Sequence, residues 1–305
     1  MITSMDELLQ ASRKGESVRV AVAAADDEAA LSAMIAAASL RISMPLLFGD
    51  EKKIATLLQK VEGGAGSSFE IRHVPDENEA AVQAVAAIRK GEAQILLKGK
   101  IKTALLLKAV VDSEKGLRLN RLLSDVFLFE NVHRSGRRLM IITDGGVTLK
   151  PDLKQKIEII ENAVFVMHTL GIAVPKVALL SAVETVNPSL PSTLDAAIIT
   201  KMNHRGQIKG CIIDGPLALD NAVSPAAART KELHTPIAGQ ADILVCPDIE
   251  SANMLAKSMC YFAGFRLGHV MVGAVAPVLI PSRADNADSK LLSVALGKLV
   301  GKYTA

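Results

Sequence analysis

The chain has 305 residues, of which 50% are hydrophobic, 22% are charged and only 3% are aromatic. This length is enough for two domains of roughly 150 residues each, and the apolar content excludes a disordered chain. The net charge of +3 is too balanced for a protein that binds nucleic acid by bulk electrostatics. With no Trp and only two Tyr, the core must consist mainly of Ala, Val, Ile and Leu, which suits helices packed on a sheet.

The sequence also argues against a membrane-spanning or exported chain. No uncharged apolar run reaches the ~18 residues that a bilayer span requires, because Gly and Pro interrupt the nearest one, 267–282. The N-terminus, MITSMDELLQ, has early acidic residues and no hydrophobic region of a secretory signal. Cys211, Cys246 and Cys260 form neither a CxxC pair nor a zinc pattern, so inert thiols are expected. These features predict a cytoplasmic protein.

In the first half of the chain, short apolar segments alternate with amphipathic ones. Strands are expected at 17–24, 45–48, 69–74 and 93–97, and helices at 26–40, 50–61, 77–90 and 102–111. Asp50 is expected to cap the second helix, and Gly91 to follow the third in a left-handed conformation. The apolar segments 123–129 and 138–143 are too close together for a crossover helix, so we expect them to pair antiparallel.

The second half continues the alternation. Strands are expected at 177–181, 210–214, 241–246 and 269–275, and helices at 152–170, 191–203, 249–262 and 285–299. This order predicts an α/β protein with largely parallel sheets. In such sheets ligands bind at the carboxyl ends of strands or between domains, so polar residues that follow a strand are candidates for function.

The most informative stretch is 273–290, GAVAPVLIPSRADNADSK, in which a strand leads through a loop into a helix. Backbone N–H groups at the start of a helix favour an anion, and the guanidinium of Arg283 suits a phosphate. Ser282 adds a hydroxyl, and the carboxylate of Asp288 is a candidate base, with Lys290 nearby. The alternative is a helix capped by Ser282 whose charged residues are solvated.

Four other segments place polar residues near strand ends. They are 97–103 (LKGKIKT), 181–188 (SAVETVNP), 211–223 (CIIDGPLALDNAV) and 246–257 (CPDIESANMLAK). The first lacks the full phosphate-binding pattern GxxxxGK[ST], so it predicts at most a phosphate cradle and not a nucleotide-hydrolysing loop. Local turns, helix caps and solvated charges are the alternative for all four. The candidate ligand-binding residues are Lys98, Glu184, Asn187, Asp214, Asp220, Asn253 and Lys257.

Two other chemistries have no support in the sequence. The six histidines show no HxH or HExxH spacing, so no metal site is expected. The chain has no GxSxG motif for a nucleophile elbow and no GxGxxG motif for a dinucleotide.

Taken together, these segments closely resemble the phosphate acetyl/butyryl transferase family, and most closely its phosphate butyryltransferase branch. The resemblance spans most of the chain and thins before residue 90. Besides 181–188, it is carried by EKGLRLNRLLSDVFLFE (114–130), PDLKQKIEIIENAV (151–164), STLDAAIITKMNHRGQIKGCIIDGPLALDNAVS (192–224), ADILVCPDIESANMLAKSMCYFAG (241–264) and GAVAPVLIPSRADNADSKLLSVAL (273–296).

The resemblance implies a fold similar to that of isocitrate and isopropylmalate dehydrogenases, with two α/β domains that flank a cleft. The first domain would comprise residues 1–138 and 273–305, and the second residues 139–272. It also implies a phosphate acyltransferase that moves a short-chain acyl group, butyryl or acetyl, reversibly between coenzyme A and inorganic phosphate. Coenzyme A would be a substrate, acyl phosphate the other acyl carrier, no separate cofactor would be needed, and a homo-oligomer is expected.

The family's functional residues carry over onto this sequence with different security. Its Ser-Arg pair falls on Ser282 and Arg283. Its general-base aspartate stands six or seven residues after the serine; Asp288 is nearest, the seventh position is Ser289, and Asp285 is the substitute. The family's TGN-x-x-YK-like run is here SANMLAK, which keeps Asn253 and Lys257 as expected contacts for coenzyme A.

Two other functions compete with this one. The same fold hosts nicotinamide-dependent decarboxylating dehydrogenases, which would need clustered acids for a divalent metal, and fold alone does not decide function. A protein that binds coenzyme A without turnover is the other alternative. Reduction of a nicotinamide by hydroxy acids would favour the first, and tight binding of coenzyme A without acyl transfer the second.

Overall fold

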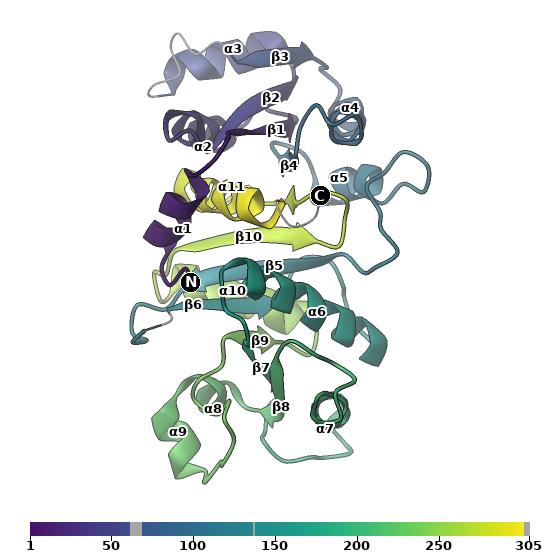
Figure 1. Ribbon diagram of the computed structural model, residues 1–305. Helices are drawn as coiled ribbons and strands as arrows, with labels where there is room; N and C mark the ends of the chain where they lie inside the picture. Colours follow the sequence, from purple (N-terminus) through teal and green to yellow (C-terminus); the bar gives the residue numbers. More distant parts are fainter. Residues whose placement is uncertain (62–68, 137, 302–305) are drawn as a thin grey trace. The chain divides into compact units, whose positions relative to one another are not determined.

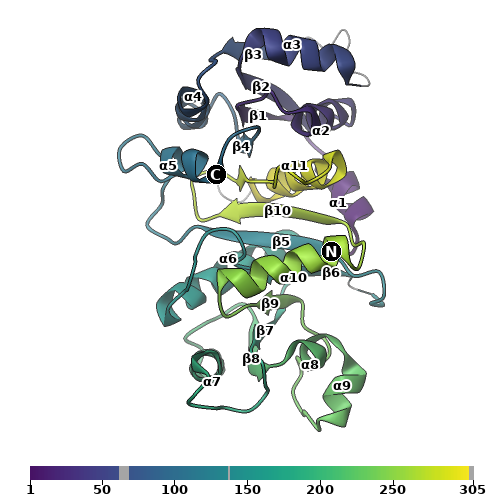
Figure 2. The same ribbon diagram turned by 180° about the vertical axis from the view of Figure 1, so that it is seen from behind.

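The computed structural model describes residues 1–61, 69–136 and 138–301 (Figures 1 and 2). The chain forms two compact units. The terminal unit comprises Met5–Arg121 and Arg266–Ala305, and the central unit comprises Met1–Ser4 and Leu122–Phe265. The C-terminal segment thus belongs with the N-terminal part of the chain. The boundaries of the two expected functional domains, 138/139 and 272/273, lie somewhat further along the chain and stay predictions.

The sheet of the terminal unit has the strand order β3-β2-β1-β4-β11-β10. Neighbouring strands are parallel except for β10 and β11, which pair antiparallel. Its strands are β1 (Val18–Ala23), β2 (Ser43–Gly49), β3 (Glu70–His73), β4 (Ile95–Lys98), β10 (Leu267–Val272) and β11 (Val278–Leu279). The last four residues of β1 are fully buried, as expected for a strand covered by helices on both faces.

Helices cover both faces of this sheet. They are α1 (Met5–Ser12), α2 (Glu28–Ser39), α3 (Glu51–Lys60), α4 (Glu77–Arg89), α5 (Thr103–Val110) and α11 (Ala287–Gly301). Helices α2 and α11 lie on one side of the strands and α4 and α5 on the other (Figures 1 and 2). The alanines of α2 let helix α11 approach closely, and α11 is buried from Leu292 to Val300.

The sheet of the central unit has the strand order β5-β6-β9-β7-β8. Strands β5 and β6 are antiparallel, as predicted, and the other neighbours are parallel. The strands are β5 (Ser124–Glu130), β6 (Leu139–Thr143), β7 (Lys176–Leu180), β8 (Ile212–Leu217) and β9 (Ile243–Val245). The helices are α6 (Leu153–Thr169), α7 (Pro191–His204), α8 (Leu219–Val223), α9 (Pro225–Thr230) and α10 (Ile249–Tyr261).

The predicted local signals act as expected in most elements. The side chain of Asp50 accepts hydrogen bonds from two backbone N–H groups of α3, and Gly91 has a φ of 73°. The start of α11 differs from the prediction: the helix begins at Ala287, and the side chain of Asn286 accepts the N–H of Ser289. Ser282 therefore lies in a turn before the helix and is not its cap.

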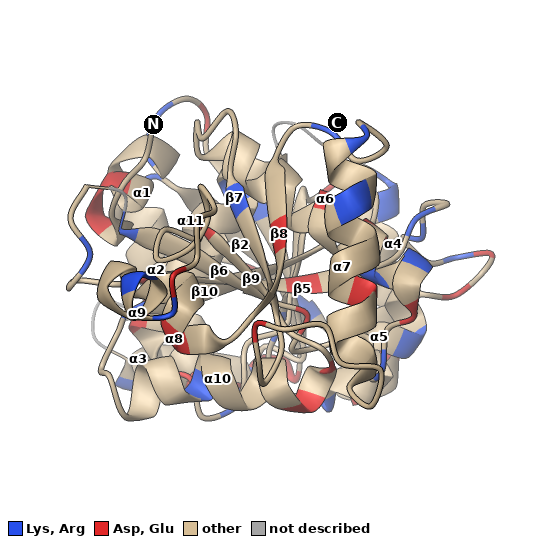
Figure 3. Cartoon of the chain, turned by 90° about the horizontal axis from the view of Figure 1, so that it is seen from below, with Lys and Arg blue, Asp and Glu red and all other residues tan. Residues whose placement is uncertain are grey.

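Charged residues of both signs are interspersed along the helices of the central unit, as α7 shows in Figure 3. One pair of opposite charge joins two helices, because the ammonium of Lys156 on α6 lies 2.6 Å from the carboxylate of Asp195 on α7. Among the described residues, no helix combines the length and hydropathy that crossing a membrane requires.

Candidate functional site

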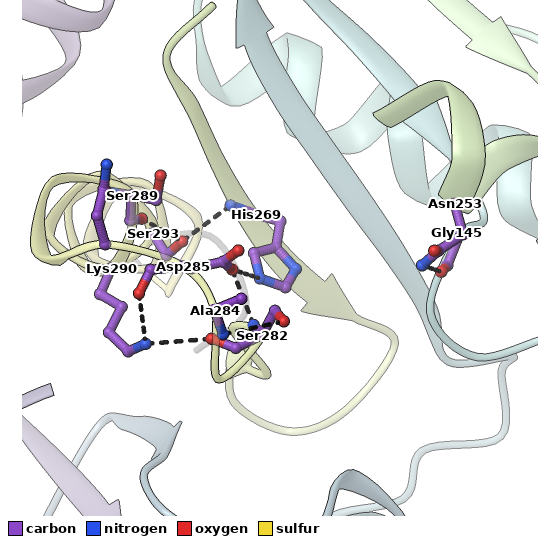
Figure 4. Close-up of polar contacts among 10 residues, drawn as sticks. Gly145, Asn253, His269, Ser282, Ala284, Asp285, Ser289, Lys290 and Ser293 are labelled. Atoms are coloured by element: carbon purple, nitrogen blue, oxygen red, sulfur yellow. Dashed lines mark hydrogen bonds and ion pairs between the residues drawn. The ribbon is translucent and has the colours of Figure 1, made fainter. Parts of the chain in front are cut away.

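The loop from Ser282 to Asp285, between β11 and α11, forms a closed turn (Figure 4). The N–H of Asp285 donates to the carbonyl oxygen of Ser282 at 3.1 Å, and a carboxylate oxygen of Asp285 accepts the N–H of Ser282 at 2.8 Å. The hydroxyl oxygen of Ser282 accepts the N–H of Ala284 at 3.3 Å. Ser282 and Arg283 are exposed at the tip of this turn, so both side chains are accessible to a ligand.

Two buried lysines lie beside this loop. Lys98 ends β4 and is 3% exposed, and Lys290 in α11 is 1% exposed. Burial lowers the pKa of the Lys98 ammonium, and the positive charges of Lys290 and Arg283 lower it further, although Asp27 and Asp285 oppose them. Within the described ranges, none of these three cations forms an ion pair with a carboxylate. Their summed charge favours a phosphate or another compact anion.

Glycine 99 explains how β4 delivers Lys98 to this place. The N–H of Gly99 donates to the carbonyl oxygen of Ala23, and the N–H of Lys100 donates to that of Ala24. A Cβ atom at position 99 would collide with the carbonyl oxygen of Ala24, so only glycine allows the two strand ends to approach so closely. The LKGKIKT segment is thus fixed against the end of β1.

The two candidate bases have different surroundings. Both carboxylate oxygens of Asp288 accept hydrogen bonds from the guanidinium of Arg266, at 2.9 and 3.0 Å. Arg266 also pairs with Asp6. The carboxylates of Asp288 and Asp6 raise the pKa of the Arg266 guanidinium above its usual value, which indicates a structural group of ion pairs. Asp285 instead lies in the exposed turn, and its Oδ2 is 3.9 Å from the Nε2 of His269, which is buried on β10.

A hollow of about 730 Å³ opens next to Arg283 within the terminal unit. Its basic lining residues are Lys52, Lys53, Lys100 and Arg283, and its acidic lining residues are Asp26, Asp27 and Glu28. Asp27 is already used as the cap of α2, because its side chain accepts the N–H of Ala30. Four basic and three acidic side chains therefore line a space large enough for part of an extended ligand.

The candidates of the central unit belong to a polar network of their own. The ammonium of Lys231 lies 3.0 Å from Glu184 and 3.4 Å from Asp220. This pairing lowers the pKa of Glu184 and raises that of Lys231. The side chain of Asn221 also donates to Glu184. The structure thus brings Glu184 and Asp220 together, as mutual partners of one lysine.

The other candidates of this unit are spread over three elements. Asn187 accepts the N–H of Ser189 through its side chain, which shapes the turn before α7. Asp214 lies half-buried in β8. Asn253 on α10 donates to the carbonyl oxygen of Gly145 at 2.9 Å (Figure 4), and Lys257 on the same helix is exposed. The substrate-binding roles of these residues stay predictions.

The thiols and histidines form no second site. Burial raises the pKa of Cys211 to about 11 and that of Cys246 to about 12, so neither is a nucleophile at neutral pH. Both flank strands β8 and β9, and the prediction that they lie inside strands was wrong by one residue. No cluster of three or more His, Cys, Asp or Glu residues able to hold a metal ion occurs in the described part of the chain.

Sequence reasoning found Lys98, Ser282 and Arg283 and placed Lys290 near them without a role, but it missed His269. His269 gave no local signal, because its contact with Asp285 joins residues far apart in the chain. Lys290 did give a signal: it is followed by the apolar run LLSVAL in a helix that is buried on all sides. A lysine at a core position of such a helix indicates that its ammonium has a polar partner inside the protein, because unpaired lysines are rarely buried.

The fold places the chain among two-unit α/β enzymes. A branched-chain phosphotransacylase from Enterococcus faecalis superposes with a TM-score of 0.80 at 33% identity, over 93% of this chain and 99% of that one. A solved protein assigned to the 4-hydroxythreonine-4-phosphate dehydrogenases, from Salmonella typhimurium, matches with a TM-score of 0.53 at 15% identity, over 94% and 100%. The second likeness concerns the fold alone, and it confirms the expected relation to dehydrogenase folds.

The sequence comparisons identify the family. The model described as "Phosphate acetyl/butaryl transferase" matches residues 62–297. Phosphate butyryltransferase from Clostridium beijerinckii is 42% identical over 98% of this chain and 98% of its own length. Phosphate acetyltransferase from Thermotoga maritima is 42% identical over 96% and 98%. The chain therefore belongs to the phosphate acetyl/butyryl transferase family, and it is an acyltransferase enzyme.

Proposed function

We propose that the enzyme transfers a short-chain acyl group reversibly between coenzyme A and inorganic phosphate, within one complex that holds both substrates. The observation that carries this proposal is the gathering of Arg283, Lys98 and Lys290 around the Ser282 turn. Arg283 and Lys98, which have no carboxylate partner among the described residues, suit a dianionic phosphate, which is both a substrate and the leaving group of the reverse reaction, and the charge of Lys290 adds to the positive potential. No covalent acyl-enzyme is needed when both substrates are bound together, because catalysis is then positioning plus electrostatics.

In the direction of thioester synthesis, a carboxylate takes the proton of the coenzyme A thiol while the sulfur attacks the carbonyl carbon of the acyl phosphate. A carbon–sulfur bond forms, the bond between that carbon and the phosphate oxygen breaks, and inorganic phosphate leaves. A free thiol has a pKa of ~8.5, so only a small part is thiolate at neutral pH and a base accelerates the attack. Arg283 and the hydroxyl of Ser282 stabilise the negative charge on the carbonyl and phosphate oxygens.

Asp285 is the better candidate for the base than Asp288. The carboxylate of Asp288 is held on both oxygens by Arg266, so it would have to break this pair to accept a proton. The contacts described for the carboxylate of Asp285 use only its Oδ2, and the residue lies in the same turn as Ser282 and Arg283. Proton transfer requires the base to be within hydrogen-bond reach of the thiol, which favours the residue on the loop.

The hollow beside Arg283 is the candidate site for the nucleotide end of coenzyme A. That end carries a pyrophosphate and a 3′-phosphate, and Lys52, Lys53 and Lys100 provide positive charge around the space. Arg283 lines this hollow and also stands in the Ser282 turn. In the proposed complex, the pantetheine arm extends from the hollow past Arg283 and brings the thiol to the reacting carbonyl.

The names of three compared relatives state an acyl group, which is short in two of them. They are named for butyryl, acetyl and branched-chain groups. We extend short-chain specificity to this enzyme on that basis. A homo-oligomeric state and a cytoplasmic location stay predictions.

A coupled assay of coenzyme A release tests the proposed function. Acetyl-, propionyl-, butyryl- and isobutyryl-CoA are each supplied with and without inorganic phosphate. We expect release that depends strictly on phosphate and equals the acyl phosphate formed. Release without phosphate, or none with any of the four thioesters, would contradict the proposal.

A further inference from the structure

The buried ammonium of Lys290 donates hydrogen bonds to the backbone of the Ser282 turn (Figure 4). Its Nζ donates to the carbonyl oxygen of Ser282 at 3.2 Å and to that of Asp285 at 3.0 Å. The two acceptors are the first and last residues of the turn. The side chain therefore clamps both ends of the segment that carries Arg283.

The cost of burying this charge argues for a role. Lys290 is 1% exposed and has only neutral carbonyl oxygens as described partners. Lys98 lies near enough for the two ammonium groups to repel each other. A buried cation without a carboxylate partner is unfavourable, and an apolar side chain of similar length would fill the same space at lower cost.

The backbone bonds alone do not fix where the turn lies relative to α11. The hydrogen bonds between Ser282, Ala284 and Asp285 close the turn on itself. The ammonium of Lys290, one helical turn into α11, ties this closed unit to the rigid helix.

We propose that Lys290 is a positioning residue, which orients the Ser282–Asp285 turn so that Arg283 and Ser282 meet the charge that develops during acyl transfer. This inference rests on the proposed function of that turn. Lys290 itself lies behind the turn and acts through its carbonyl groups. Misplacement of a catalytic group by about 1 Å costs on the order of 10²-fold in rate, which sets the size of the expected effect.

The test compares Lys290→Met with Lys298→Met. Lys298 is equally buried in the same helix, two turns further along, and does not contact the Ser282 turn in the described contacts. We expect Lys290→Met to lower kcat by about 10²-fold with the KM for acyl-CoA within about threefold of wild type. Lys298→Met should keep kcat within about threefold.

A double-mutant cycle separates positioning from a merely structural role. If Lys290 acts through the turn, then Lys290→Met should cost less than about threefold in an Arg283→Ala background, because the group that it orients is gone. If the losses of kcat caused by Lys290→Met and Arg283→Ala multiply in the double variant, the inference is overturned. An unchanged kcat in Lys290→Met, or an equal loss of kcat in Lys298→Met, would also overturn it. So would a Lys290→Met protein that shows no cooperative thermal unfolding transition, because the loss of activity would then reflect loss of the fold. A wild-type enzyme without phosphate-dependent transfer would contradict the proposed function instead.

Discussion

Two groups of charged side chains, one in each unit, show how a structural polar network differs from a candidate ligand site. In the central unit, Lys231 is paired with Glu184 and Asp220, so its charge is neutralised by the protein itself. In the terminal unit, Lys98 and Arg283 have no carboxylate partner among the described residues, and the positive charge of Arg283 helps to lower the pKa of Lys98. Both groups follow strand ends and look alike in the sequence. An unneutralised cluster calls for an anion from outside, whereas a paired one does not.

Arg283→Ala should produce the largest effect, because it removes the exposed cation nearest to the reacting groups. Loss of a group that stabilises developing charge costs about 10²–10³-fold in kcat. Lys231→Ala, which disrupts the paired network of the central unit, is the matched control and should keep kcat within about threefold. Steady-state kinetics with butyryl-CoA and phosphate measure both. Equal losses in the two variants would erase the distinction between the groups.

Asp285→Asn should lower kcat by about 10²-fold if this carboxylate removes the thiol proton. Asp288→Asn should weaken the pairing with Arg266 and leave kcat within about fivefold. The rate of thioester synthesis from acyl phosphate, followed against pH, distinguishes the two. A greater loss in Asp288→Asn would restore Asp288 as the base.

Lys98→Met should raise the KM for phosphate by roughly tenfold, the usual worth of one charge-assisted hydrogen bond. The protonated ammonium binds phosphate, so the wild-type KM should rise as pH increases through the lowered pKa of Lys98. In the variant this rise should be absent. Because folding lowers this pKa, the wild-type free energy of unfolding should increase with pH between the folded and unfolded values. A KM with the same pH dependence in both proteins would show that Lys98 does not touch phosphate.

Lys52→Ala and Lys53→Ala should have the smallest effect, a rise of a few-fold in the KM for butyryl-CoA, because exposed charges are screened by solvent. If these lysines contact the 3′-phosphate, the same variants should show no change with the 3′-dephospho thioester. Lys14→Ala, at an exposed residue outside the hollow, serves as the control. An equal rise in KM with both thioesters would show that these lysines do not contact the 3′-phosphate of coenzyme A.

Local patterns predicted the repeating elements well, because burial on both faces imposes continuous apolar strands such as β1. They missed β11, since two residues carry no periodicity and Val278 and Leu279 become a strand only by pairing with β4. They also missed α1 and α9, which are short. The start of α11 was placed too early, because Ser282, Asp285 and Asn286 are all suitable caps and a turn closed by Asp285 decides between them.

The candidate site could be predicted only in its local part. Ser282 and Arg283 stand together in the sequence, and the glycine in LKGKIKT marks the close approach beside Lys98. The partners that change the interpretation come from elsewhere. Arg266, just before β10, pairs with Asp288, and Lys231, just after α9, pairs with Glu184. Contacts of this kind depend on the tertiary fold, so no window of sequence reveals them.

The cations beside the Ser282 turn are proposed to bind phosphate. Titration calorimetry with inorganic phosphate tests it without turnover, on the wild type, Arg283→Ala, Lys98→Met and Lys231→Ala. We expect one site per chain in the wild type and in Lys231→Ala, and binding weaker by roughly tenfold or more in the other two. Unchanged affinity in Arg283→Ala and Lys98→Met, or weakened affinity in Lys231→Ala, would contradict it.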